Sequence, residues 1–209
     1  MGRDKVFGII LPSTTTPTED KIHGIEIAQK LGIDYKEVGI DNILNEYLSL
    51  NRIGDNKLAI GNLKARIRMS IIYYYANTYN LMVCGTGNKS ELLIGYFTKY
   101  GDGACDMEPI GDLYKTEVFE LARHLNVPEE IICKPPRAGL WNNQTDEDEI
   151  GMSYEILDQI LYLYTQGLKA DEISEKLNIS TDDVNMIIDK VVRSQHKNRV
   201  PEIPEKTIL

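Results

Sequence analysis

Short apolar segments alternate with amphipathic segments along the first half of the chain, and this alternation restricts the fold more than any other feature. One apolar segment, residues 6–11, ends at Pro12, and another, residues 81–84, is equally short. Apolar runs of this length are typical of strands that are buried on both faces of a sheet. Strands that alternate with helices form parallel sheets covered on both faces. We therefore expect an α/β fold with a doubly wound, Rossmann-like parallel sheet.

Helices are expected between the strands. Thr16 is predicted to cap a helix that has Pro17 in its first position, and Glu19 completes a capping box. Gly32 is expected to end this helix in the left-handed conformation. A second strand is predicted over residues 34–40 and a short helix over 41–50. Apolar residues at helical spacing predict a longer helix over 62–79.

Composition limits the class of protein. The 209 residues, 42% of them hydrophobic, suit one domain, which we divide into an α/β part (1–150) and a helical extension (151–209). No apolar run is long enough to span a bilayer, and the three separated cysteines indicate neither a disulfide framework nor a zinc site. A net charge of −9 argues against a general nucleic-acid binder. The expected location is the cytoplasm.

The segment 86–106, "TGNKSELLIGYFTKYGDGACD", follows the last predicted strand and leads into a helix. Ligands of open α/β sheets bind at the carboxyl ends of the strands, where loops and helix N-termini converge. Thr86 presents a hydroxyl there, and Glu91 presents a carboxylate that can ligate Mg²⁺ carrying phosphates. In the alternative interpretation, Asn88 or Ser90 caps the helix and Glu91 only complements its dipole.

Several basic residues stand close to these elements. Lys99 lies among aromatic residues, Lys115 lies where a helix begins, and the C-terminal segment contains His196, Lys197 and Arg199. Each alone is more often a solvated surface charge. Together, in an acidic protein, they favour a bound polyphosphate.

Seven motifs occur in the same order as in ammonia-dependent NAD synthetases: "GNLKARIRM", "GTGNKSE", "GYFTKYGDGACD", "GDLYKTEV", "KPPRAGLW", "QTDEDEIG" and "SQHKNRVP". The chain most resembles the short archaeal-type enzymes without a glutaminase domain, from the first predicted strand almost to the C-terminus. The resemblance implies the adenine nucleotide α-hydrolase fold. It also implies a homodimer that binds deamido-NAD across the subunit interface.

The resemblance further implies a reaction and its site. ATP adenylates the nicotinate carboxylate of deamido-NAD, pyrophosphate leaves, and ammonia then displaces AMP. Glu91 is implied as a Mg²⁺ ligand, and Thr86 and Lys115 as contacts of ATP. The residues implied for deamido-NAD are Arg66, Lys99, Asp106, His196 and Lys197. No catalytic general base is assigned.

The chain departs from the family pattern in two places. Arg137 replaces a Ser or Thr that contacts ATP, and its guanidinium can either bind phosphate or crowd the pocket. The family's Ser-Gly-Gly-x-Asp-Ser loop, which holds pyrophosphate and a second Mg²⁺ ligand, has no counterpart in the printed sequence. We therefore expect the printed chain to be a fragment, or a decayed copy, that makes no NAD⁺. The otherwise intact helix and strand signals favour a start further upstream.

Three alternatives remain. Residues 168–195 resemble a helix-turn-helix, but Asp182 and Asp183 at its groove-facing end would repel DNA, so we favour a helical appendage that delivers His196 and Lys197 to the substrate. A different ligase of the same fold, forming GMP or asparagine, would lack the GYFTKYGDG segment. The linker 134–151, which contains four consecutive acids, is interpreted as either a mobile lid or a solvated loop.

Overall fold

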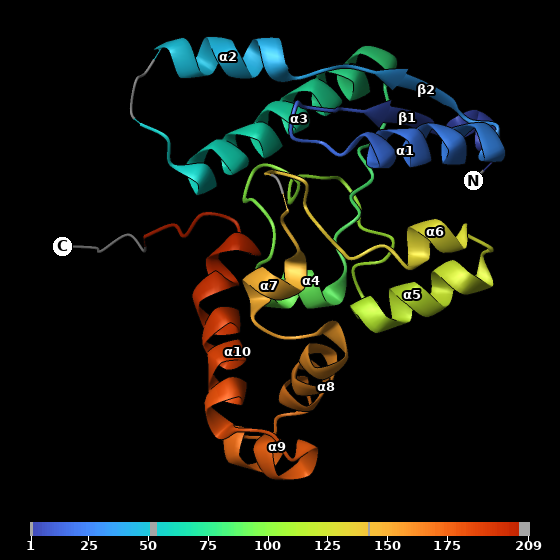
Figure 1. Ribbon diagram of the computed structural model, residues 1–209. Coiled ribbons are helices and arrows are strands. Elements are labelled where there is room, and N and C mark those ends of the chain that lie inside the picture. The colour runs from blue at the N-terminus through green and yellow to red at the C-terminus, as the bar shows by residue number, and fades with distance from the viewer. Residues whose placement is uncertain (1, 51–53, 142, 205–209) are drawn as a thin grey trace.

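The computed structural model describes residues 2–50, 54–141 and 143–204. Its elements, in chain order, are η1 (Arg3–Lys5), β1 (Phe7–Ile10), α1 (Thr18–Leu31), β2 (Asp34–Glu37), α2 (Asp41–Leu50), α3 (Lys57–Tyr79), α4 (Lys89–Ile94), α5 (Lys115–His124), α6 (Glu129–Ile132), α7 (Asp146–Ile150), α8 (Tyr154–Thr165), α9 (Ala170–Leu177), α10 (Thr181–Ser194) and η2 (Gln195–Lys197). The fold is the expected helix-rich α/β arrangement with parallel strand pairing (Figure 1).

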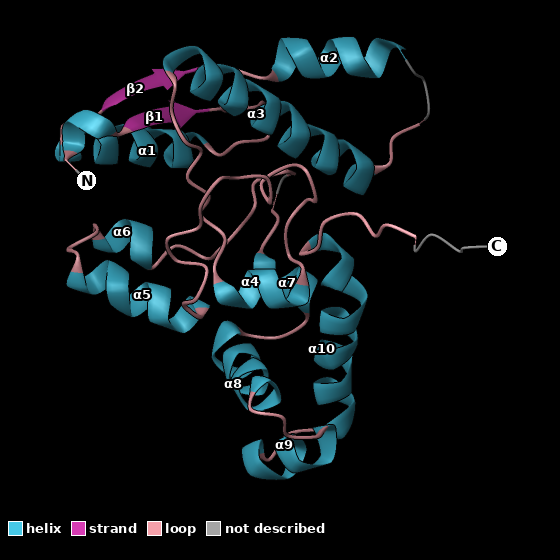
Figure 2. Cartoon of the chain, turned by 180° about the vertical axis from the view of Figure 1, so that it is seen from behind, coloured by secondary structure: helices cyan, strands magenta, loops and turns pink. Residues whose placement is uncertain are grey.

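Strands β1 and β2 pair in parallel, with Phe7 opposite Asp34 and Ile10 opposite Glu37. Helices α1 and α3 lie on opposite sides of this pair, as the two views show (Figures 1 and 2). On the α3 side, the ring of Phe7 stacks on Tyr75 with 6.2 Å between the ring centroids. Alternate residues of β1 therefore face different helices, as the period of a strand requires.

The predicted helices are confirmed, with changes at their starts. Helix α2 has the predicted bounds, and Gly32 ends α1 with a φ of 64°. Thr16 does not cap α1, because its hydroxyl accepts a hydrogen bond from the Ser13 N–H at 2.9 Å and Pro17 takes the N-cap position. Helix α3 begins five residues earlier than predicted, at Lys57, behind an Asn56 cap.

The prediction of a buried strand over residues 81–84 is wrong. Val83 is buried, but Leu81 and Met82 are 41% and 65% exposed. The Val83 N–H donates to the Asp106 carboxylate, and a single parallel bridge joins Cys84 to Met107. The Asp106 side chain thus accepts the bond that a neighbouring strand's backbone carbonyl would accept in a regular sheet. Within the described residues, the regular sheet has two strands.

Helices α8, α9 and α10 form a unit in which α8 and α9 lie below α4 and α7, while α10 runs alongside them (Figure 1). Its core includes Leu157, Ile173, Val184 and Ile187, all fully buried, and continues into Ile94 of α4. The helical appendage therefore packs on the α/β part through one shared core. The boundary at residue 150 stays a prediction. None of the helices in the described residues is long and apolar enough to cross a membrane.

Candidate active site

A cavity of about 750 Å³ lies between the end of β1 and the segment around residue 84. Ile9 and Leu11 form one wall, and Val83 and Cys84 form another. The polar lining includes Thr86, Glu91, Lys115, Asp146 and Lys197. Three residues predicted to bind ATP and Mg²⁺, together with one predicted to bind deamido-NAD, therefore line a single cavity.

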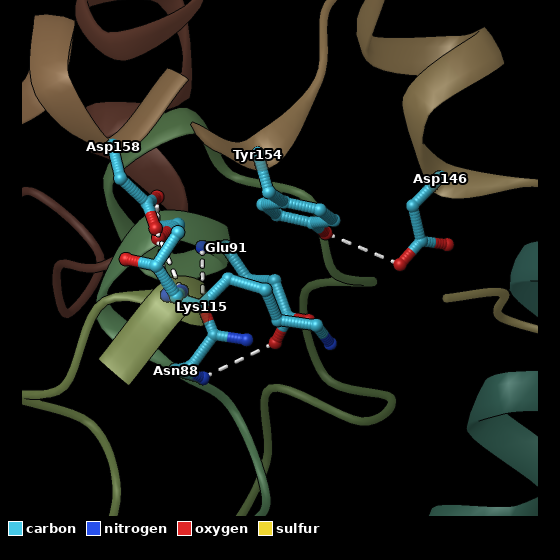
Figure 3. Close-up of polar contacts among 8 residues, drawn as sticks. Asn88, Glu91, Lys115, Asp146, Tyr154 and Asp158 are labelled. Atoms are coloured by element: carbon cyan, nitrogen blue, oxygen red, sulfur yellow. Dashed lines mark hydrogen bonds and ion pairs between the residues drawn. The ribbon is translucent and has the colours of Figure 1, made fainter. Parts of the chain in front are cut away.

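Glu91 has two kinds of neighbour at the start of α4. Its carboxylate accepts from the Asn88 N–H at 3.1 Å, and its own N–H donates to the Asn88 side chain at 3.0 Å, which is a reciprocal capping box. The Lys115 Nζ lies 3.4 Å from the Glu91 Oε1 (Figure 3). Burial raises the pKa of Glu91, and the charge of Lys115 opposes this shift. The capping interpretation is confirmed, and the same carboxylate also lines the cavity.

Asp146 is the most buried acid of the cavity wall, with 4% of its surface exposed. One of its oxygens accepts from the Tyr154 hydroxyl at 3.1 Å (Figure 3). The other, Oδ1, is buried and has no hydrogen-bond partner among the described residues. Burial raises the pKa of Asp146, and the charge of Lys115 opposes this. The solvated-loop interpretation is wrong for this residue, because Asp146 begins the helix α7.

We expect Asp146→Asn to raise the free energy of unfolding at pH 7 by roughly 1 kcal/mol, because it removes a buried, half-partnered charge but keeps an acceptor for Tyr154. A folded pKa above the ordinary 3.8 means that wild-type stability falls as the pH rises from 3.8 through the folded value. The gain should therefore be largest at neutral pH and vanish below 3.8.

Thermal unfolding across this pH range measures the effect. Asp55→Asn is the control, because Asp55 is exposed in the loop before α3 and its substitution should change stability by less than about 0.5 kcal/mol. A lower melting temperature for Asp146→Asn at pH 7 would contradict the prediction.

Four of the residues predicted to bind deamido-NAD form one basic cluster: Arg66, Lys99, His196 and Lys197. The Arg66 guanidinium donates to the Lys99 carbonyl at 3.3 Å, and the Lys99 ammonium donates to the His196 carbonyl. Lys197 donates to two carbonyl oxygens at the end of α4, at 2.6 and 2.8 Å. Elements far apart in the sequence thus meet through these bonds, and Lys197 lines the cavity.

Asp106 lies apart from that cluster. Its carboxylate accepts from the Tyr73 hydroxyl at 3.1 Å and from the Val83 N–H at 2.7 Å. Both bonds tie the segment around Val83 to α3. In this structure the carboxylate therefore has a structural contact set, and its role toward deamido-NAD stays a prediction.

Arg137 is held by α1. Its guanidinium donates to the Asp20 carboxylate at 2.9 and 3.1 Å and also contacts Glu19. Lys134 reaches the same Asp20 at 2.6 Å. The guanidinium also lines the cavity, but the two carboxylates of α1 offset its charge. These ion pairs connect α1 to the segment 134–141. They favour a structural role for Arg137 over a contact with phosphate.

Two buried acids near the cavity were not anticipated as site residues. The sequence pattern places Asp146 in an acidic linker, and it does not single out Asp158. Asp158 is the one acid inside the apolar run of residues 156–164, and it is 5% exposed. An acid in such a run needs a buried partner, and that is the signal which could have identified it.

The sequence comparisons identify related proteins. A family model described as NAD synthase matches residues 1–201. An NH(3)-dependent NAD(+) synthetase of Methanocaldococcus jannaschii is 48% identical over 98% of the chain and 80% of its own length. One from Archaeoglobus fulgidus is 47% identical over 97% of the chain and 78% of its own length.

Solved structures agree with these matches. An NMN synthetase from Francisella tularensis superposes with a TM-score of 0.85 and is 35% identical, covering 96% of the chain and 79% of its own. An NH3-dependent NAD synthetase from Campylobacter jejuni, in complex with the nitrate ion, has a TM-score of 0.78 and is 30% identical, covering 96% and 78%.

Proposed function

Since the chain belongs to the NAD synthase family, we propose that the cavity around Glu91 and Lys115 is the site of the family's reaction. The protein is a ligase that forms a C–N bond, the ATP-dependent amidation of deamido-NAD by ammonia. We place the reaction in this cavity because Thr86, Glu91 and Lys115 all line it.

The reaction makes the nicotinate carboxylate a better acyl donor. A carboxylate oxygen attacks the α-phosphorus of ATP, and pyrophosphate leaves with the electron pair of the broken P–O bond. The ammonia nitrogen then attacks the activated carbonyl carbon, AMP leaves, and the nitrogen loses a proton. The protein contributes by positioning two nucleotides and by offsetting phosphate charge, because ammonia is already a competent nucleophile.

Thr86 and Lys115 are proposed to bind the phosphates of ATP, and Glu91 to ligate Mg²⁺. Lys115 supports this assignment because its side chain is only 17% exposed, so its charge is weakly screened by water. Mg²⁺ binds one or two protein carboxylates and completes its shell with phosphate and water. The Glu91 carboxylate suits that mode, because it lines the same cavity as Thr86 and Lys115. A bound ion would offset the negative charge of the phosphates.

Deamido-NAD is proposed to bind at the basic cluster, Arg66, Lys99, His196 and Lys197, together with Asp106. The support is that Lys197 lines the cavity, and that Arg66, Lys99 and the neighbouring His196 are joined by hydrogen bonds. A dinucleotide that carries two phosphates is the kind of ligand that such a cluster attracts.

A homodimer is proposed as the working form, in the cytoplasm. The support is an aromatic surface on α3, where Tyr74 is 71% and Tyr79 is 59% exposed. Large exposed aromatic side chains are enriched at protein interfaces. Sedimentation velocity tests the proposal, and a monomer at micromolar concentration would contradict it.

Calorimetry tests the assigned substrate. We expect saturable binding of deamido-NAD and none of XMP or aspartate, the substrates of other ligases with this fold. The mononucleotide counterpart of deamido-NAD is a second candidate, because a similar structure is an NMN synthetase. Tighter binding of the mononucleotide would overturn the assignment.

A further inference from the structure

A buried carboxylate on α8 connects the first turns of two helices that carry site residues. Asp158 contacts Ser90 of α4 through one oxygen, and its other oxygen accepts from the Thr116 N–H of α5 at 2.8 Å. Ser90 in turn accepts from the Lys115 N–H at 2.9 Å. Figure 3 shows Asp158 against these two helix starts.

The residues joined by Asp158 are next to, or identical with, the residues proposed to bind the nucleotide. Ser90 directly precedes Glu91, and Lys115 is the first residue of α5. Asp158 does not itself line the cavity. Any influence it has on the cavity therefore passes through Ser90 and the backbone of α5.

The same face of α8 also holds the Lys115 side chain. Tyr154, one turn before Asp158, lies with its ring centroid 5.3 Å from the Lys115 Nζ. Residues four apart lie on one face of a helix. Helix α8 thus contacts Lys115 at its amide through Ser90 and Asp158, and at its ammonium through Tyr154.

Electrostatics strengthen this arrangement. The first N–H groups of a helix have no partner within it, and they carry the positive end of the helix dipole. A carboxylate supplied by another helix satisfies two needs at once, because it accepts a hydrogen bond and complements the dipole. The contact between Asp158 and Ser90 is shielded from water, since Ser90 has no exposed surface and Asp158 is 5% exposed.

We propose that Asp158 is a positioning residue for the nucleotide site. It bridges the first turns of α4 and α5 and so sets the separation of the Glu91 carboxylate from the Lys115 ammonium. This inference rests on the proposed roles of Glu91 and Lys115 toward Mg²⁺ and ATP. It gives the helical extension a function in catalysis beyond delivering His196 and Lys197.

Asp158→Asn tests the proposal with little change in shape. The amide carries no charge, and its nitrogen can only donate to the Ser90 hydroxyl, so the contacts with Ser90 and Thr116 both lose their charged acceptor. We expect the affinity for Mg²⁺-ATP, measured by calorimetry, to fall about tenfold, as the loss of a charged hydrogen bond implies. The affinity for deamido-NAD, measured in the same way, should not change, because the effect is confined to the contacts of Mg²⁺-ATP.

Leu161→Ala is the matched control. Leu161 is fully buried on the same helix but belongs to the apolar core, so its truncation destabilises α8 without touching Ser90 or Thr116. Below both unfolding temperatures, Leu161→Ala should bind Mg²⁺-ATP as the wild type does. Equal weakening in both variants, or normal binding by Asp158→Asn, would overturn the proposal.

Ser90→Ala provides a second variant if Asp158→Asn does not fold. It removes the relay to the Lys115 N–H but keeps the Asp158 bond to Thr116. We expect weaker Mg²⁺-ATP binding in this variant also, and unchanged binding would count against the proposal. Failure of the proposed function looks different, because Glu91→Ala would then bind Mg²⁺-ATP normally. Loss of binding in Glu91→Ala together with normal binding in Asp158→Asn and Ser90→Ala would refute the positioning role alone.

Discussion

In a chain that carries the complete phosphate loop, Glu91→Ala is expected to abolish Mg²⁺-dependent ATP binding. The carboxylate lines the cavity and lies 3.4 Å from Lys115, where the phosphates are proposed to bind. Altering groups that only support a metal ligand commonly lowers metal affinity by about 10- to 100-fold, so loss of the ligand itself should exceed about 100-fold. Calorimetric titration of ATP with and without Mg²⁺ measures the change.

Glu117→Ala is a closely matched control. Glu117 holds the same third position in α5 that Glu91 holds in α4, and it accepts from the Tyr114 N–H at 2.8 Å. It does not line the cavity. Both variants should lose about 0.5–2 kcal/mol of stability from the missing cap, but only Glu91→Ala should lose ATP binding. Equal ATP affinities in the two variants would show that Glu91 acts only as a cap.

Ile187→Ala should cost about 2–5 kcal/mol of stability, because truncating a buried aliphatic side chain loses its transfer free energy and leaves a cavity. Ile187 is fully buried on α10 in the core that also contains Ile94 of α4. Because the core is shared, we expect one cooperative unfolding transition at a lower denaturant midpoint. Urea unfolding followed by circular dichroism and by tryptophan fluorescence measures this.

Val192→Ala, on the exposed side of the same helix, should change stability by less than about 0.5 kcal/mol. The sole tryptophan, Trp141, lies outside the helical unit and reports on the cavity wall. Two separate transitions would mean that α8–α10 unfold independently of the α/β part. That result would also weaken the inference that Asp158 couples the two.

Local signals alone predicted several elements. The bounds of α2, the left-handed Gly32 and the strand at β1 follow from patterns that span a few residues. The position of Glu91 in the first turn of a helix was predicted in the same way. These features depend on contacts between near neighbours in the chain, such as caps and apolar periodicity, and the residues involved are adjacent in the sequence.

The errors have a common physical origin. At Thr16, a hydrogen bond to the Ser13 N–H competes with the predicted helix cap. At residues 81–84, apolar composition predicted burial, but the Asp106 side chain takes the Val83 N–H, and Leu81 and Met82 remain exposed. In both places a polar group outside the pattern determined the structure.

The sequence by itself determined the α/β class and the family resemblance, and it singled out Glu91 and Lys115, which both line the cavity. Only the tertiary structure decided which partners these residues have. Asp158 and Ser90 are 68 positions apart, yet their contact fixes the starts of α4 and α5. A sequence shows that an acid is present, but the donor that it meets, and the water that it loses, depend on how distant elements pack.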